Sequence, residues 1–513
     1  MATDPQWEPA ETAVRVEAAV RAEAARTETP VRAEAAVRAE TAEPAGAAEE
    51  ADAATATATD TATAAATASA ARRERAVRAA VAHGLIGPDR PVVGLLDVTG
   101  IRAAAGALRA AFAEVTAPGT AVLHAFAVKA AALVPVLRLL ADEGLGCEVA
   151  SPGELALARA AGVGADRIVL DSPAKTPGEL AEALALGVAV NADNPQELAR
   201  LDALIAVVPG PEPRSPIGLR VNPQLGGGAI DAMSTATATS KFGVALRDAG
   251  AREWVVRAFT DRPWLTRLHA HVGSQGCSLE LLAAGVRAAY ELAEEINRAV
   301  GRRQVDTLDI GGGLPVNFAS DEVTPAYRDY ARVLRAAAPG LFDGRYVLVT
   351  EFGRSLVAKS GTVLARVEYA KSAGGRAIAI THAGAQVAVR TVFAPESWPL
   401  RVAAYDAEGR PKPAGDDTVQ DVAGPCCFAG DLVAVGRRLP RLAAGDLAAL
   451  LDTGAYYFSH HFAYNSLPRP AVYGFATAED GDVRFATVRS PQTVEELIAE
   501  SGGAHAAALT GLG

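Results

Sequence analysis

The sequence contains few cysteines, few aromatic residues and no long apolar run. Four cysteines in 513 residues do not make a disulfide framework, so we expect a reducing compartment. No apolar stretch reaches the length that spans a bilayer, and the first residues lack the apolar segment of a secretory signal. These absences predict a cytoplasmic protein without a membrane partner.

An excess of positive charge is also absent. The chain has 49 basic and 60 acidic residues, and its formal net charge is −11 at pH 7. A surface that binds nucleic acid or an anionic membrane carries the opposite sign, so the charge argues against both partners. The length allows two or three domains with a sizeable core.

Residues 1–70 have almost no large aliphatic or aromatic side chains. This tract is rich in Ala, Thr, Glu and Arg, with a loose Val-Arg-x-Glu repeat. Because it can bury too little surface to offset the entropy of ordering, we predict a leader that is disordered or transiently helical. The segment 71–99 is typical of a basic helix followed by a short strand, and we assign it to the β domain predicted at the C-terminus.

Short β-branched runs alternate with Ala- and Leu-rich helical stretches between residues 100 and 355. This alternation is typical of α/β proteins with a parallel sheet, and eight such units predict a (β/α)8 TIM barrel. From 356 to 513, Val-rich strands with Gly and Pro turns predict a separate, β-barrel-like domain. The eight candidate strands are 121–128, 145–149, 167–170, 187–191, 217–221, 267–272, 305–310 and 346–350.

Lys129 follows the apolar run 121–128, where an ammonium group is poorly solvated. Only six of the 49 basic residues are lysine, so its use here instead of arginine is informative. A buried lysine has a lowered pKa and can form a Schiff base, which arginine cannot do. Taken alone, a lysine whose amine reaches from a strand end into water is the favoured interpretation, and the residues further along the chain reverse that preference.

Other polar and glycine residues follow the sixth, seventh and eighth candidate strands. The active sites of such barrels lie at the carboxyl ends of the strands. Consecutive glycines leave backbone N–H groups free to approach an anion, and a serine hydroxyl and an arginine are suitable phosphate ligands. A phosphate site and a Schiff-base lysine in one barrel mouth indicate pyridoxal 5'-phosphate (PLP). The residues are His271, Ser274, Gly311, Gly312, Gly313, Glu351 and Arg354.

Seven ordered segments of the chain resemble the fold-type III PLP enzymes, in particular the diaminopimelate and ornithine decarboxylase group. The resemblance covers roughly residues 92 to 475. It includes the lysine segment, both glycine-containing strand ends and a cysteine loop near the C-terminus. The segments are 126–130, 240–243, 269–274, 308–313, 351–354, 424–427 and 454–456.

This resemblance implies roles for particular residues. Lys129 binds PLP as a Schiff base, His271 stacks on the pyridine ring, and Glu351 pairs with the pyridine nitrogen. Cys427 reaches the active site of a neighbouring subunit and delivers a proton, which implies a homodimer with shared active sites. The phosphate is held by Ser274, Gly311, Gly312, Gly313, Arg354 and Tyr456.

The reaction that the resemblance implies is PLP-dependent decarboxylation of an amino acid. The alternative on the same fold is racemisation or epimerisation, in which Lys129 and a group across the ring exchange the α-proton. A PLP carrier without turnover is less consistent with the sequence, because a carrier needs neither a β domain nor Cys427. We expect no metal site, since the adjacent His460 and His461 have no third ligand at a suggestive spacing.

Two departures from the family pattern concern the substrate. The diamino-acid decarboxylases have an acid after the cysteine that recognises the distal amino group, and this chain has Phe428. In the segment 384–394 the arginine of a carboxylate clamp is kept as Arg390, while its tyrosine is replaced by Ala394. We therefore expect a substrate other than a diamino acid, although Arg390 can equally be an ordinary surface or interface residue. The expected substrate-binding residues are Arg354, Arg390, Phe428 and Tyr456.

Overall fold

The structure is a computed structural model that describes residues 45–206, 213–415, 417–478 and 480–512, with side chains from residue 63 onward. Residues 60–513 form one compact unit, and residues 45–59 belong to a separate one. The first 44 residues of the predicted leader lie outside the described part of the chain. No helix in the described ranges is both long enough and apolar enough to cross a membrane.

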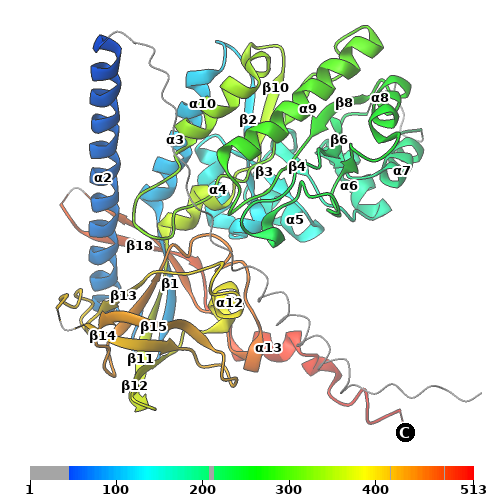
Figure 1. Cartoon of the computed structure of the whole chain (residues 1–513). Helices are drawn as coiled ribbons and strands as arrows, with labels where there is room; N and C mark the ends of the chain where they lie inside the picture. The colour runs from blue at the N-terminus through cyan, green and yellow to red at the C-terminus, as the bar shows by residue number, and fades with distance from the viewer. Residues whose placement is uncertain (1–44, 207–212, 416, 479, 513) are drawn as a thin grey trace, which may run out of the picture. The chain divides into compact units, whose positions relative to one another are not determined.

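Eight parallel strands form a closed barrel, which confirms the predicted (β/α)8 architecture (Figure 1). The first and last barrel strands pair with each other, and the fourth pairs with the fifth, so the ring has no free edge. A two-residue strand, β7 (Val244–Ala245), adds to the fifth. The barrel strands are β2 (Val122–Ala127), β3 (Gly146–Val149), β4 (Ile168–Leu170), β5 (Ala189–Ala192), β6 (Ile217–Asn222), β8 (Leu265–His269), β9 (Thr307–Asp309) and β10 (Val347–Thr350).

Helices alternate with these strands and cover the barrel. Their ends carry local stop and start signals: Thr176 and Glu179 form a reciprocal capping box at the start of α6, and Gly187 ends it in a left-handed conformation. The helices are α3 (Val98–Val115), α4 (Val134–Asp142), α5 (Pro152–Ala160), α6 (Pro177–Leu186), α7 (Pro195–Ala206), α8 (Ala251–Asp261), α9 (Leu279–Val300), α10 (Tyr327–Ala337) and α11 (Arg354–Val357).

A nine-stranded sheet forms the second domain. Strand β1 precedes the barrel in sequence but pairs with β11 and β17 of this sheet, so segments from both sides of the barrel sequence form the same sheet. The strands are β1 (Val92–Asp97), β11 (Gly361–Ala373), β12 (Arg376–Thr381), β13 (Val402–Tyr405), β14 (Asp417–Ala423), β15 (Leu432–Pro440), β16 (Leu447–Leu451), β17 (Val472–Thr477) and β18 (Val483–Arg489), with helices α12 (Ala385–Phe393) and α13 (Val494–Glu500).

Residues 45–70 are the first part of helix α2 (Ala45–Ala82), in the tract for which the sequence predicted a disordered or transiently helical leader. Alanine has the highest helix propensity, and a helix continues readily from a turn that is already formed. The later turns of α2 supply that anchor, because Ala76, Val77 and Ala80 are buried in a cluster with residues of the β domain.

The β domain contacts the mouth of the barrel through the turn that contains Tyr456. The Tyr456 N–H donates to the Ala130 carbonyl at 2.7 Å, and the Ser459 hydroxyl donates to the Lys129 carbonyl at 3.0 Å. Tyr456 has a φ of 68°, a left-handed conformation that is uncommon for a non-glycine residue. This junction places an aromatic ring of one domain beside the lysine of the other.

Candidate active site

Lys129 lies in a single helical turn (Val128–Ala130) directly after β2, at the carboxyl end of the barrel. Its Nζ lies 2.7 and 2.6 Å from the two carboxylate oxygens of Glu148 on the neighbouring strand β3. The Lys129 side chain is 45% exposed, whereas the Glu148 side chain is fully buried. The lysine therefore faces the open barrel mouth while its charge is held by a carboxylate beneath it.

The expected lowering of the Lys129 pKa is wrong for this structure. Burial alone lowers the pKa, but Glu148, Tyr456 and Glu351 outweigh burial and raise the pKa above its ordinary value. Conversely, burial raises the pKa of Glu148, although Lys129 opposes the shift. The sequence indicated the apolar strand before the lysine and did not show the acid that the barrel places against it.

Three glycines after β9 form a turn into which no side chain fits. A Cβ at Gly312 would collide with the backbone carbonyl of Glu351, and a Cβ at Gly313 would collide with that of Gly273. The Gly311 carbonyl accepts a hydrogen bond from the Glu351 N–H at 2.7 Å, which ties the glycine turn to the loop after β10. Such a cradle allows an anion to approach the backbone closely.

Ser274 and His271 lie in the loop after β8. The Ser274 N–H donates to the Met233 carbonyl at 3.0 Å, and the Gly312 N–H donates to His271 Nδ1 at 3.1 Å. Burial, together with Arg220 and Lys129, holds the pKa of His271 well below its ordinary value. The imidazole is therefore neutral, and an uncharged flat ring suits stacking against a pyridine ring.

Glu351 follows β10 and has one carboxylate oxygen without a partner. Its Oε1 is buried and has no hydrogen bond among the described residues, while Oε2 lies 3.5 Å from His269 Nε2. Burial and then Asp309 raise the pKa of Glu351 to about 8. A protonated pyridine nitrogen would satisfy the free oxygen and stabilise the carboxylate, so this residue fits the cofactor that the sequence indicates.

Arg354 and Arg390 stack against the same two aromatic rings. The guanidinium carbon of Arg354 lies 4.4 Å from the Trp398 ring centroid and 4.5 Å from that of Tyr456. For Arg390 the corresponding distances are 5.1 and 4.4 Å. No ion pair joins either arginine to an acid in the described part of the chain. This arrangement, which we call the arginine pair, leaves two guanidinium groups without an acidic partner among the described residues.

Burial disfavours the charge of the arginine pair. It lowers the pKa of Arg354 to about 10, with Arg390 as a further cause, and it also lowers the pKa of Arg390. Arg354 Nε and one terminal nitrogen of Arg390 are buried without hydrogen-bond partners in the described ranges. A bound carboxylate or phosphate would supply both the missing charge and the missing acceptors.

Trp398 is a site residue that the sequence analysis missed. Ala394 ends helix α12, and the Trp398 N–H donates to its carbonyl at 3.0 Å. Trp398 thus lies one turn of chain after Ala394, the position where the family has tyrosine, and its indole ring contacts the arginine pair. The signal in the sequence was Trp398 itself, an aromatic residue four positions after Ala394, where the family has tyrosine.

Cys427 and Phe428 make their contacts within the β domain. The exposed Cys427 donates its N–H to Asn465 Oδ1 at 2.8 Å. The Phe428 ring stacks on Phe393 at 5.5 Å between centroids and packs edge-on against Tyr464 at 5.2 Å. Neither residue contacts Lys129 of its own chain by any hydrogen bond or ring contact in the described residues. The structure therefore brings together the predicted cofactor residues and leaves the cysteine loop on the surface.

The glycine cradle, the unpartnered Glu351 oxygen and the lysine in one barrel mouth define a PLP enzyme of the barrel class. The sequence matches the family described as "Pyridoxal-dependent decarboxylase, pyridoxal binding domain" over residues 102–358. The chain belongs to this family. It is a PLP-dependent amino-acid decarboxylase, a carboxy-lyase.

Curated relatives support the same assignment. The chain is 35% identical to a diaminopimelate decarboxylase of Pseudomonas fluorescens over 382 residues, which is 74% of this chain and 86% of the relative. It is 30% identical to a diaminopimelate decarboxylase of Zymomonas mobilis over 377 residues, which is 73% of this chain and 85% of the relative.

Solved structures share the fold. A diaminopimelate decarboxylase of Helicobacter pylori complexed with L-lysine superposes with a TM-score of 0.69 at 25% identity, covering 80% of this chain and 97% of the other. A lysine/ornithine decarboxylase of Vibrio vulnificus complexed with putrescine gives a TM-score of 0.63 at 23% identity, covering 78% and 97%. The second likeness is evidence of fold alone.

Proposed function

We propose that this decarboxylase acts on an α-amino acid that carries a distal acidic group and lacks a distal ammonium group. The α-carboxylate leaves as carbon dioxide, one proton is added at the α-carbon, and the product is the corresponding amine. The observation that carries this proposal is the arginine pair, in which the buried Arg354 and the half-buried Arg390 have no acidic partner among the described residues.

The arginine pair accounts for a distal acid. Two guanidinium groups held between Trp398 and Tyr456 present several N–H donors in fixed directions, which suits a carboxylate. Arg390 lies on helix α12 of the β domain, whereas Arg354 follows the last barrel strand. Arg354 is therefore suited to the cofactor phosphate or the substrate, and Arg390 to the distal end of the substrate.

Phe428 accounts for the lack of a distal ammonium. The only acid in the loop 424–431 is Asp431, and its two oxygens accept the backbone N–H groups of Ala385 and Cys426, both at 2.6 Å. It is thus committed to holding the loop. An ammonium group placed against the Phe428 ring would lose its hydration without gaining a carboxylate, which costs several kcal/mol.

Bound PLP would supply an electron acceptor for the pair left at the α-carbon when carbon dioxide departs. Lys129 needs a neutral amine to bind the cofactor covalently, and the Glu148 carboxylate at 2.6 Å is positioned to take its proton. His271 would orient the ring, and the glycine cradle, Ser274 and Tyr456 would hold the phosphate. Glu351 would accept a hydrogen bond from the protonated pyridine nitrogen.

We assign the proton at the α-carbon to Cys427 of a second subunit. Within one chain its loop lies apart from Lys129, while its exposure leaves the thiol accessible to a neighbour. This role requires a homodimer in which each subunit completes the other's site. The proposal therefore includes two shared active sites per dimer.

Diaminopimelate is the second candidate substrate. It is favoured by the relatives, which are described as diaminopimelate decarboxylases. Diaminopimelate also has a distal carboxylate, so the arginine pair is compatible with it. The two candidates differ only in the distal amino group, for which this chain has Phe428 in place of an acid.

The replacement Arg390→Gln tests the distal acid. We expect KM for substrates with a distal carboxylate to rise about tenfold or more, the usual scale for a lost charge-assisted pair, while affinity for PLP stays unchanged. Arg441→Gln, at an exposed position of the same domain, is the matched control. A loss of PLP affinity, or an equal rise of KM for amino acids without a distal acid, would contradict the assignment.

A further inference from the structure

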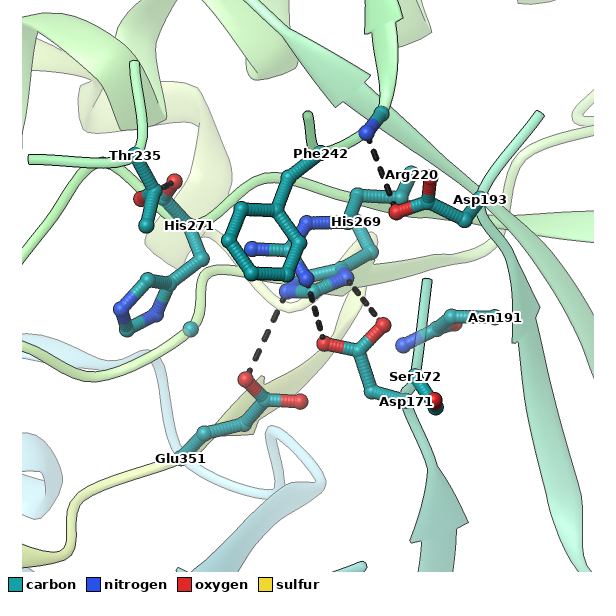
Figure 2. A network of polar contacts seen from close by, with 12 residues as sticks. Asp171, Ser172, Asn191, Asp193, Arg220, Thr235, Phe242, His269, His271 and Glu351 are labelled. Atoms are coloured by element: carbon teal, nitrogen blue, oxygen red, sulfur yellow. Dashed lines mark hydrogen bonds and ion pairs between the residues drawn. The ribbon is translucent and has the colours of Figure 1, made fainter. Parts of the chain in front are cut away.

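Three buried ionisable residues lie in a row beneath the barrel mouth. Asp171 follows β4, His269 ends β8, and Glu351 follows β10, and their exposed fractions are 6%, 0% and 5%. His269 Nδ1 lies 3.5 Å from Asp171 Oδ1, and His269 Nε2 lies 3.5 Å from Glu351 Oε2. Figure 2 shows the imidazole between the two carboxylates. The position of each nitrogen opposite a carboxylate oxygen limits the protonation state of the ring.

An imidazole with a carboxylate at each nitrogen is a cation. A neutral imidazole carries a proton on one nitrogen only, so its other nitrogen would face a carboxylate lone pair to lone pair. Burial alone lowers the pKa of His269, but Asp171, Glu351 and Asp309 outweigh it and raise the pKa well above its ordinary value. Each nitrogen of the protonated ring therefore faces a carboxylate oxygen at 3.5 Å, an ion-pair distance at which neither contact has the geometry of a hydrogen bond.

Asp171 is fixed as an anion from its other side. Arg220 of strand β6 donates to Asp171 Oδ2 at 3.0 Å, and its guanidinium carbon lies 4.4 Å from the centroid of the Phe242 ring. Although burial raises the pKa of Asp171, Arg220 and His269 outweigh burial and lower it strongly. Charges thus alternate along Arg220, Asp171, His269 and Glu351.

The remaining charged groups around His269 come from the neighbouring strands. Asp309 at the end of β9 faces it and pairs with Arg267 of β8 at 3.5 Å. His271 is two residues further along the chain and neutral. With these groups included, His269 is the cation that lies against the Glu351 carboxylate.

A metal ion is the other arrangement that such a trio allows, since the ligand atoms of Asp171, His269 and Glu351 lie within 4.8 Å of one another. Asp171 Oδ2 already accepts a hydrogen bond from the Arg220 guanidinium, and a second arginine, Arg267, is buried close by. A divalent cation would add charge next to two arginines. The alternating charges of Arg220, Asp171, His269 and Glu351 explain why these residues lie together without a metal ion.

We propose that His269 is a positioning residue that keeps the Glu351 carboxylate ionised and directed at the pyridine nitrogen of bound PLP. Burial by itself favours a protonated Glu351. A protonated carboxyl has no negative charge with which to stabilise a protonated pyridine nitrogen. His269 opposes the effect of burial on Glu351, whose pKa stays at about 8 before a pyridinium is present. The protonated pyridine nitrogen of bound PLP would add a second cation beside the carboxylate. Asp171 and Arg220 keep His269 in place. The proposal rests on the proposed role of Glu351 and not on the identity of the substrate.

The test compares PLP with an analogue in which carbon replaces the ring nitrogen. Binding of each to protein freed of cofactor is measured for the wild type, His269→Gln and Glu351→Gln. We expect His269→Gln to lower PLP affinity about tenfold, the factor that one pKa unit represents, and to leave affinity for the analogue unchanged. The signal of 15N-labelled PLP should also move toward the unprotonated nitrogen in this variant.

His124→Gln is the matched control, because this buried barrel histidine bonds Thr350 Oγ1 at 2.9 Å and no carboxylate. It should leave both affinities unchanged. If His269→Gln weakens PLP and the analogue equally, or neither, the proposal is overturned. If Glu351→Gln also fails to distinguish them, the role of Glu351 itself is wrong. His269→Asn provides a second variant should the glutamine variant not fold.

Discussion

Lys129 is the residue on which cofactor binding depends. Replacing it with alanine removes the amine that binds PLP covalently, so we expect the visible absorbance of the protein-bound cofactor to disappear and activity to fall by several orders of magnitude. The absorbance spectrum of the purified variant checks this. Lys371→Ala, on an exposed part of β11, should keep the wild-type spectrum. A Lys129→Ala protein that retains the band would refute the assignment.

Phe428 is the residue that separates this chain from the diamino-acid enzymes. Phe428→Glu restores an acid at the position after the cysteine, and we expect kcat/KM for diaminopimelate to rise about tenfold or more through a new ion pair. Phe428→Leu, which removes the ring without adding charge, should show no such gain. An unchanged rate with the glutamate variant would mean that this position does not contact the distal amine.

The residue scale also shows the limit of sequence reasoning. Lys129, Glu351 and the glycine triplet were identified because each follows an apolar strand, and local pattern is sufficient for that. The pairing of Lys129 with Glu148 and of His269 with Asp171 and Glu351 depends on which strands are neighbours in the closed barrel. In the sequence, the partners Glu148 and His269 were visible only as polar residues within predicted strands.

At the scale of elements, helix α2 is joined to the barrel and the β domain by one ion-pair network. Asp321, in the loop between β9 and α10, lies 2.9 Å from Arg73 of α2 and 2.8 Å from Arg401, which precedes β13. Burial raises the pKa of Asp321, but Arg401 and Arg73 outweigh it and lower the pKa below its ordinary value. The network therefore favours the charged aspartate.

This network predicts a pH-dependent stability. A lowered pKa in the folded state stabilises the protein above the ordinary aspartate pKa, about 4, and the gain is lost as the pH falls below it. Asp321→Asn should reduce the free energy of unfolding by about 2 kcal/mol at neutral pH and by less in acid. Denaturant unfolding at two pH values measures this, with Asp89→Asn, at an exposed position outside the network, as control. Equal losses at both pH values would contradict it.

The elements themselves were largely predictable. The eight barrel strands follow a βα rhythm that the sequence shows directly, and the β1 segment is a short apolar strand before the first helix. The start of α2 was not predictable from burial, because its first turns contain only small and polar residues. Helix propensity of alanine outweighed the lack of a hydrophobic face.

At the scale of the whole molecule, the proposed shared site requires a dimer. Mixing inactive Lys129→Ala and Cys427→Ala subunits should restore about a quarter of the wild-type activity, since half of randomly assorted dimers have one intact site of two. Activity is measured before and after subunit exchange, together with the mass of the particles. Two variants that stay inactive in a verified mixed dimer would show that each site lies within one chain.

The central claim is that this decarboxylase prefers a substrate with a distal acid and no distal amine. The direct measurement is the ratio of kcat/KM for 2-aminopimelate to that for meso-diaminopimelate, with carbon dioxide release as the readout. These compounds differ only in the distal amino group that would meet Phe428. We predict a ratio of about ten or more in favour of 2-aminopimelate. A ratio well below one would contradict the account and identify the chain as a diamino-acid decarboxylase.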